Sequence, residues 1–278
     1  MVPTFGCNTL YPRGRLPRTV GAFDVAAHRE ALRTIREAGL DGCEFSHYEH
    51  LPPADQEKLR GVCACLGLRP WSAHSWEALP AEPAHVEGTL PGLFSSLEGA
   101  ARLGVRVLVV HAASAAPQAY PQRAAALATC LGTLAPRAEA VGITIAVENC
   151  AHRQDLEFLA ETLERLDLPA IGFNIDTGHA VLGGMTPDDA IRIMGKRLAT
   201  THLQDNFGQR DDHLPPGRGS IAWEPVRDAL RQVGYTGMLM VEISDCPPER
   251  EPQPVLDTRA AADFLKTLFG VSLGRSPA

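Results

Sequence analysis

Short apolar blocks alternate with longer amphipathic stretches along the chain, and this pattern predicts strands and helices in turn. Eight apolar runs have the length and the β-branched content of strands, at residues 5–10, 42–46, 68–72, 105–110, 143–147, 171–175, 199–203 and 238–243. Stretches with helical spacing lie between them, and those at 25–38, 93–103 and 124–141 are each followed by a glycine where a helix would end. The chain is therefore predicted to repeat a strand–helix unit.

Eight repeats of this unit favour a closed barrel over an open sheet. The run at 107–110, Val-Leu-Val-Val, has no polar face, so it must be buried on both sides. Eight strand–helix units in 278 residues fit one (β/α)8 TIM barrel. We predict a single TIM-barrel domain over residues 1–278, with about 271–278 as a frayed tail and the active site at the carboxyl ends of the strands.

An open doubly wound sheet is the alternative architecture, and it would carry a glycine fingerprint for a dinucleotide after its first strand. Here that strand is followed by Tyr-Pro-Arg-Gly-Arg at 11–15, and the chain has neither a G-x-G-x-x-G motif nor a P-loop motif. The sequence therefore gives no support to nucleotide binding.

Net charge and composition limit the kinds of partner and the location expected for the chain. The chain has 26 Lys and Arg against 33 Asp and Glu, a net charge of −7, so it lacks the basic excess of a general nucleic-acid binder. No apolar run approaches the length of a membrane span, and the amino terminus has no basic segment followed by an apolar one. The seven cysteines are scattered without metal or redox spacing, which favours reduced thiols and a cytoplasmic location.

Side chains of metal-ligand type gather where the predicted strands end. In a TIM barrel those positions point into the active-site mouth. The last four strands supply one such residue each, namely Glu148, Asp176, His202 and Glu242. Any one of them alone would more often be a structural polar group, but four converging groups would repel one another unless a cation lay between them. We therefore expect one divalent metal ion, most readily Mn²⁺ or Zn²⁺, with Mg²⁺ and Co²⁺ as alternatives.

Five short motifs make the chain resemble a known superfamily. They are Val-Glu-Asn at 147–149, Asp-Thr-Gly-His at 176–179, His-Leu-Gln-Asp-Asn at 202–206, His-Leu-Pro-Pro-Gly-Arg-Gly at 213–219 and Val-Glu-Ile at 241–243. In this order they resemble the xylose-isomerase-like TIM barrels, in the branch of the sugar phosphate isomerases and epimerases. The resemblance assigns the metal to Glu148, Asp176, His202 and Glu242, and gives His179 a contact with substrate oxygen.

The reaction that this resemblance implies is proton transfer at a carbon next to a carbonyl, through an enediolate. Glu148 and Glu242 would be the acid and the base, and the substrate would be a small sugar or sugar phosphate. The family pattern places an arginine about six residues after the strand-seven histidine, whereas this chain has Gly208 there and Arg210 two residues later. Arg210 and Arg218 are the candidate substrate anchors, and the polar pocket lining is expected from His74, His111 and His213.

Two other reactions remain open on the same scaffold. The superfamily includes the endonuclease IV group, phosphodiesterases with three zinc ions, and this chain has residues of every ligand type in the same order: His74, His111, Glu148, Asp176, His179, His202, Asp211, His213 and Glu242. The acidic net charge argues against a nucleic-acid substrate. A lyase of the inosose dehydratase type is the second alternative, because loss of water begins with the same proton abstraction. Barrels of this branch often pair, so the resemblance allows a homodimer and leaves the oligomeric state open.

Overall fold

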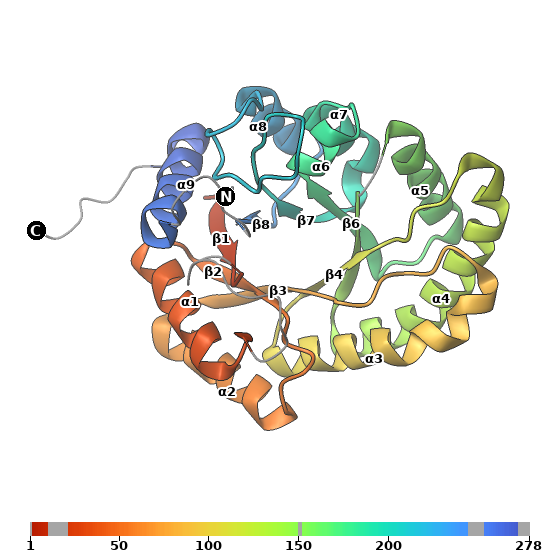
Figure 1. Ribbon diagram of the computed structural model, residues 1–278, viewed down its shortest axis with the longest axis horizontal. Coiled ribbons are helices and arrows are strands. Elements are labelled where there is room, and N and C mark those ends of the chain that lie inside the picture. Colours follow the sequence, from red (N-terminus) through yellow and green to blue (C-terminus); the bar gives the residue numbers. More distant parts are fainter. Residues whose placement is uncertain (1, 11–21, 150–151, 244–252, 272–278) are drawn as a thin grey trace, which may run out of the picture.

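Eight parallel strands form a barrel that helices surround on the outside (Figure 1). The computed structural model describes residues 2–10, 22–149, 152–243 and 253–271. The strands are β1 (Thr4–Asn8), β2 (Gly42–Ser46), β3 (Arg69–His74), β4 (Val107–His111), β5 (Thr144–Glu148), β6 (Ile171–Asp176), β7 (Leu198–His202) and β8 (Met238–Val241). All eight predicted strands are confirmed, with ends that differ by a few residues. Of the tail predicted at about 271–278, residues 272–278 lie outside the described residues.

The helices follow the strands in the predicted alternation. They are α1 (Val25–Glu37), α2 (Pro53–Leu66), α3 (Val86–Leu103), α4 (Tyr120–Val141), α5 (Arg153–Leu166), α6 (Thr177–Leu182), α7 (Pro187–Met194), α8 (Trp223–Gln232) and α9 (Pro254–Phe269). Short 3-10 turns stand at Pro83–His85, Pro117–Ala119 and Gly195–Arg197. Helix α3 begins seven residues before its predicted range, because it continues through Pro91, where a helix boundary would be expected. Helix α4 begins four residues before its predicted range and has a proline in its first turn.

Strand order runs β7-β6-β5-β4-β3-β2-β1-β8. Consecutive strands from β1 to β7 therefore pair with one another, and β1 also pairs with β8. The seam between β7 and β8 is held by few backbone bonds. The Leu203 amide donates to the Met240 carbonyl at 2.8 Å, and Leu203 and Val241 form a single parallel bridge. At the same seam, the Met240 amide donates to the hydroxyl of Thr201 at 2.9 Å, so a side chain replaces a backbone partner.

Two apolar layers are separated by the strands. The large outer core packs the outward faces of the strands against the helices, as with Phe45, Leu108 and Phe173. A small inner cluster of Val107, Val109 and Ala146 fills the lower barrel. Because side chains alternate along a strand, the next inward positions after these are His111 and Glu148, at the carboxyl ends. The strand register therefore delivers the predicted site residues to the mouth.

Candidate metal centre

The four predicted metal ligands converge at the carboxyl end of the barrel. The Nδ1 atom of His202 lies 3.0 Å from Oε2 of Glu148 and 3.1 Å from Oε2 of Glu242. Ligand atoms of Glu148, Asp176 and His202 lie within 4.8 Å of one another, and all three residues are buried. Nδ1 of His202 is buried and makes no hydrogen bond among the described residues, although it points at two carboxylates. Three carboxylates around an unsatisfied ring nitrogen suit a divalent cation, so the residues fit the expected metal.

Glu148 lies at the centre of a ring of imidazoles. Its Oε1 is 3.2 Å from Nε2 of His111 and 3.1 Å from Nδ1 of His179, and its Oε2 is 3.6 Å from Nε2 of His74. The Asn174 amide donates to Oε2 at 2.8 Å from the neighbouring strand. His74 and His111, which were predicted to line the pocket, and His179, which was predicted to contact substrate oxygen, therefore lie together around Glu148, a predicted catalytic carboxylate.

A second set of contacts joins Asp176 to the loop after β7. Asp176 ends β6, where its carboxylate caps α6 by accepting the His179 amide at 2.7 Å. The Gln204 amide nitrogen lies 3.2 Å from Oδ1 of Asp176 and donates to Asp211 at 2.7 Å. A Cβ on Gly178 would collide with the Gln204 carboxamide, which explains the glycine in this motif.

The loop that carries His213 is tied to the barrel by Asp205. This buried carboxylate accepts the Gly217 amide at 3.0 Å, the Ile221 amide at 3.1 Å and the indole N–H of Trp223 at 3.0 Å. His213 itself takes a left-handed backbone conformation, with φ 45°. Its Nε2 lies 3.5 Å from Oδ2 of Asp211 and 3.7 Å from Oε2 of Glu242.

The predicted arginine anchors are less closely bound to this cluster. Arg210 forms an ion pair with Asp212, two residues along the loop. Arg218 is exposed at the surface of the same loop, where its amide donates to the Pro215 carbonyl at 3.0 Å. A hollow of about 270 Å³ beside the cluster is lined by Leu10, Ser46, His47, His74, Ser75, Trp76, His111 and Glu242. This hollow offers small-molecule space next to the predicted ligands.

Protonation in this cluster is set by its own charges. Burial alone would raise the pKa of the Glu148 carboxyl, but the imidazoles of His111 and His202 outweigh it and hold this pKa well below its ordinary value. Burial would likewise raise the pKa of Glu242, and the charge of His202 overrides it and lowers the pKa far below normal. Both carboxylates are therefore ionised at neutral pH.

The imidazoles and Asp176 take up the compensating protons. Burial disfavours a charged His74, but contact with Glu148 prevails and raises its pKa to about 9. Burial opposes charge on His213 as well, and Glu242 raises its pKa to about 9. Burial raises the pKa of Asp176 to about 7, against the opposing charge of His179. Without a cation the cluster thus holds protons that a divalent ion would displace.

Sequence reasoning missed three polar residues around these ligands. Glu44, Asn174 and Gln204 are buried and contact His202, Glu148 and Asp176 respectively. Glu44 carried a signal that could have been read, since it is a carboxylate inside an otherwise apolar strand. Asn174 and Gln204 precede or follow a ligand by two residues, so strand alternation could have placed them beside the site.

Comparison with known proteins identifies the family. A family model described as xylose isomerase-like TIM barrel matches residues 32–268. The chain belongs to the xylose isomerase-like TIM barrel family. Its predicted fold class is thereby confirmed.

Among the described residues, no helix combines the length and the apolar character that a membrane crossing requires.

Several relatives are similar over part of their length. The chain is 29% identical over 113 residues to a D-psicose 3-epimerase of Enterocloster bolteae, covering 35% of this chain and 36% of that protein. It is 29% identical over 147 residues to an inosose dehydratase of Lacticaseibacillus casei, covering 45% and 49%. The matched segment also spans only 56% of an uncharacterized protein of Methanocaldococcus jannaschii, to which this chain is 27% identical over 165 residues, 55% of its own length.

The same fold recurs in solved structures. The crystal structure of a D-tagatose 3-epimerase-like protein superposes with a TM-score of 0.76 at 21% identity, covering 96% of this chain and 97% of that one. At this identity the likeness establishes the barrel alone.

Proposed function

We propose that this protein is a divalent-metal-dependent isomerase or epimerase of a small sugar or sugar phosphate, which works by proton transfer at a carbon next to a carbonyl. One observation carries the proposal: the imidazole of His202 stands between the carboxylates of Glu148 and Glu242, with Asp176 beside them. The similarity of the chain to a D-psicose 3-epimerase over about a third of its length supports it.

Glu148, Asp176, His202 and Glu242 would hold the metal, most readily Mn²⁺ or Zn²⁺. When bound, such a cation stabilises the negative charge that develops on substrate oxygen as the enediolate forms. The side chains supply the rest of the chemistry. Glu148 and Glu242 come from β5 and from the residue after β8, three strands apart, so they can face a substrate carbon from two directions. Both are ionised, the state in which a carboxylate accepts the α-proton.

The histidines around the carboxylates would orient the substrate. His74, His111 and His179 offer ring nitrogens near Glu148, and His213 offers one near Glu242. The mouth arginines Arg210 and Arg218 would reach hydroxyl or phosphate oxygens of a substrate held there. Trp76, exposed at 70% on the rim of the adjoining hollow, would cover an apolar face of a sugar.

The direct test is proton exchange with solvent. Metal-loaded protein is incubated in D₂O with a panel of ketoses, inososes and their phosphates, and deuterium at the α-carbon is followed by NMR. We expect exchange with at least one member of the panel, and none with Glu242→Gln. Glu224→Gln, an exposed carboxylate in the first turn of α8, is the matched control and should exchange like the wild type. Exchange that persists in Glu242→Gln would refute the two-carboxylate mechanism.

A metal-cluster phosphodiesterase is the second candidate, and a specific observation favours it. The central group consists of Glu148, Asp176 and His202. Two further groups also bring ligand atoms within 4.8 Å of one another: His74, His111 and Glu148 form one, and Asp176, His179 and His213 form the other. Glu148 and Asp176 belong to the central group as well, so each could bridge two metals. Asp211, 3.2 Å from His179, completes the set of nine.

Metal content separates the two candidates. Protein purified without chelators or added metal would be analysed by inductively coupled plasma mass spectrometry. About one divalent ion per chain supports the isomerase or epimerase. About three zinc ions per chain would favour the phosphodiesterase, and cleavage of abasic-site DNA would then be measured.

A dehydratase of the inosose type is a further candidate, because its reaction begins with the same proton abstraction as the isomerase or epimerase. The similarity of the chain to an inosose dehydratase over 147 residues supports this candidate. The same NMR experiment distinguishes it. A dehydratase gives a new product that has lost water, whereas an isomerase or epimerase conserves the composition of the substrate.

A further inference from the structure

One carboxylate of the barrel interior belongs to neither the predicted ligands nor the substrate lining. Glu44 stands in the middle of β2, is fully buried, and points inward between β1 and β3. Burial of a carboxylate is unfavourable unless charged or hydrogen-bonding partners compensate for the lost water. Its partners therefore show what it does.

Glu44 reaches across the barrel to the far side of the central imidazole. Both of its carboxylate oxygens lie 3.0 Å from Nε2 of His202. The hydroxyl of Ser72, on the adjacent strand β3, donates to Oε2 of Glu44 at 2.7 Å. Ser72, Glu44 and His202 thus form one buried chain of contacts from β3 through β2 to β7.

The two nitrogens of the His202 ring consequently have different surroundings. Nε2 faces Glu44, whereas Nδ1 faces Glu148 and Glu242. With a metal bound, His202 would be neutral: it would donate Nε2–H to Glu44 and have its lone pair on Nδ1, the atom directed at the candidate metal position. A carboxylate on the distal nitrogen also makes the ring a stronger ligand and fixes its orientation.

We propose that Glu44 is a positioning residue for the metal centre: it selects the tautomer of His202 and holds Nδ1 toward the carboxylates. Ser72 holds Glu44 in turn. The proposal rests on the metal centre of the proposed function, and not on which reaction that centre catalyses. In the described part of the chain, the carboxylate of Glu44 contacts Ser72 and His202, so it would act through His202.

The test measures metal affinity, which does not depend on turnover. Zn²⁺ or Mn²⁺ dissociation constants are measured by competition with a chromogenic chelator for the wild type and for Glu44→Gln, which keeps the side-chain volume. We expect Glu44→Gln to bind about 10-fold to 100-fold more weakly. The visible spectrum of the Co²⁺-loaded protein should shift in the same variant, because the imidazole becomes a weaker ligand.

Thr200→Val is the matched control. Thr200 is fully buried on β7 two residues before His202, and its hydroxyl accepts the indole N–H of Trp71 at 3.0 Å. The substitution disturbs the barrel interior without touching the ring of His202. It should lower the melting temperature of the metal-free protein and leave the metal affinity and the Co²⁺ spectrum unchanged.

Ser72→Ala is a second variant in case Glu44→Gln does not fold. It removes the hydroxyl behind Glu44 and should weaken metal binding several-fold. Affinity within twofold of the wild type in Glu44→Gln, or in Ser72→Ala if only that variant folds, would overturn the proposal, as would an equal loss in Thr200→Val. If the wild type itself binds no metal, the proposed function fails and this inference with it. Tight binding by both wild type and Glu44→Gln refutes the inference alone.

Discussion

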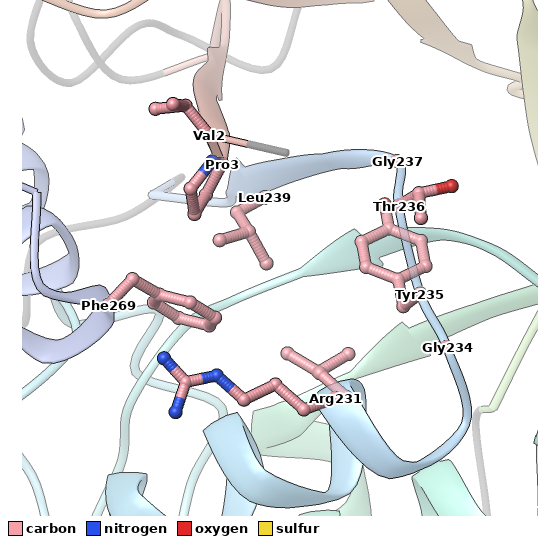
Figure 2. A pocket seen from close by; sticks show the side chains of 10 residues that line it. Val2, Pro3, Arg231, Gly234, Tyr235, Thr236, Gly237, Leu239 and Phe269 are labelled. Carbon is pink, nitrogen blue, oxygen red and sulfur yellow. The ribbon is translucent and has the colours of Figure 1, made fainter.

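The two ends of the barrel are built from opposite kinds of side chain. At the carboxyl end, carboxylates and imidazoles crowd within hydrogen-bonding distance of one another. At the amino end, a hollow of about 400 Å³ is bordered by Val2, Pro3, Leu239 and Phe269, with Arg231 beside the phenylalanine ring (Figure 2). A neighbouring hollow of about 490 Å³ is lined by Trp71 and the residues that lead into β8. Among the residues that the structure describes, neither lining contains a carboxylate or a histidine.

Along a strand, only two residues separate a position in the apolar core from a position in the charged cluster. Along β4, Val109 belongs to the inner apolar cluster, and two residues later His111 belongs to the charged one. Along β5, Ala146 and Glu148 stand in the same relation. One further inward position per strand changes the surroundings from apolar to ionised. The lower barrel should therefore govern stability, and the last inward positions should govern metal binding and turnover.

Removing one carboxylate from the mouth should have the largest effect. Glu148→Gln and Glu242→Gln each delete a metal ligand and a proton acceptor, and we expect turnover to fall about 10³-fold or more, in line with a lost general acid or base. The measurement is steady-state kinetics on the substrate found by deuterium exchange, with melting temperatures taken in parallel. Wild-type activity in either variant would break the division between the two ends.

A cavity at the amino end should change stability alone. Leu239 is 3% exposed on β8 and borders the hollow in Figure 2. Leu239→Ala should lower the free energy of unfolding by about 2–5 kcal/mol, because it leaves a cavity in the apolar packing. Urea denaturation measures this, and metal affinity per folded protein should stay at the wild-type value. A tenfold drop in affinity would show that the ends are coupled.

The protons held at the mouth predict opposite pH responses for metal-free and metal-loaded protein. His74 and His213 have pKa values of about 9 when folded against an ordinary 6.5, so they stabilise the metal-free fold below pH 6.5 and lose this contribution as pH rises toward 9. The raised pKa of Asp176, about 7, acts in the same direction up to that pH. The melting temperature of chelated protein should therefore fall by a few degrees between pH 6.5 and 9.

In the loaded protein the sign is reversed, because a cation binds the deprotonated ligands and gains affinity as pH rises. Scanning fluorimetry of both forms across this range checks the difference. A metal-free melting temperature that stays level or climbs from pH 6.5 to 9 would contradict the assignment of the protons to the histidines.

The smallest effect is expected from Arg231, a charged residue that borders the hollow of about 400 Å³ at the amino end. The Arg231 guanidinium lies 5.9 Å from the centre of the Phe269 ring, and its side chain is largely exposed. Arg231→Ala should lower the free energy of unfolding by about 0.5–1 kcal/mol and leave turnover unchanged. Altered kinetics here would reveal a ligand role for the amino end.

The barrel could be predicted from the sequence because its signals are local and repeated. Apolar runs such as 107–110 and glycine stops such as Gly104 and Gly142 mark nearly every unit, so one misplaced boundary does not change the count. The start of α3 was misplaced because Pro91 lies inside the helix, where packing overrides its usual preference for a boundary.

Much of the candidate site was predictable from residues that end strands. His74, His111, Glu148, Asp176 and His202 follow that rule, and the structure brings them together. Glu44 does not follow it, because it lies within β2 and meets His202 only through closure of the barrel. Contacts across the barrel depend on register, including the shift between Cys43 and Glu44, which no local pattern encodes.

Because few backbone bonds join β7 to β8, a metal bound beside this seam would also restrain the barrel wall. His202 ends one strand and Glu242 follows the other, so the two flank the stretch where Thr201 substitutes for a backbone partner. A cation bound by both side chains would hold β7 and β8 together at the carboxyl end of the seam. Amide hydrogen exchange at Met240, Leu203 and Glu242 would then slow upon loading, and opening of the cylinder would release the ion by the same step.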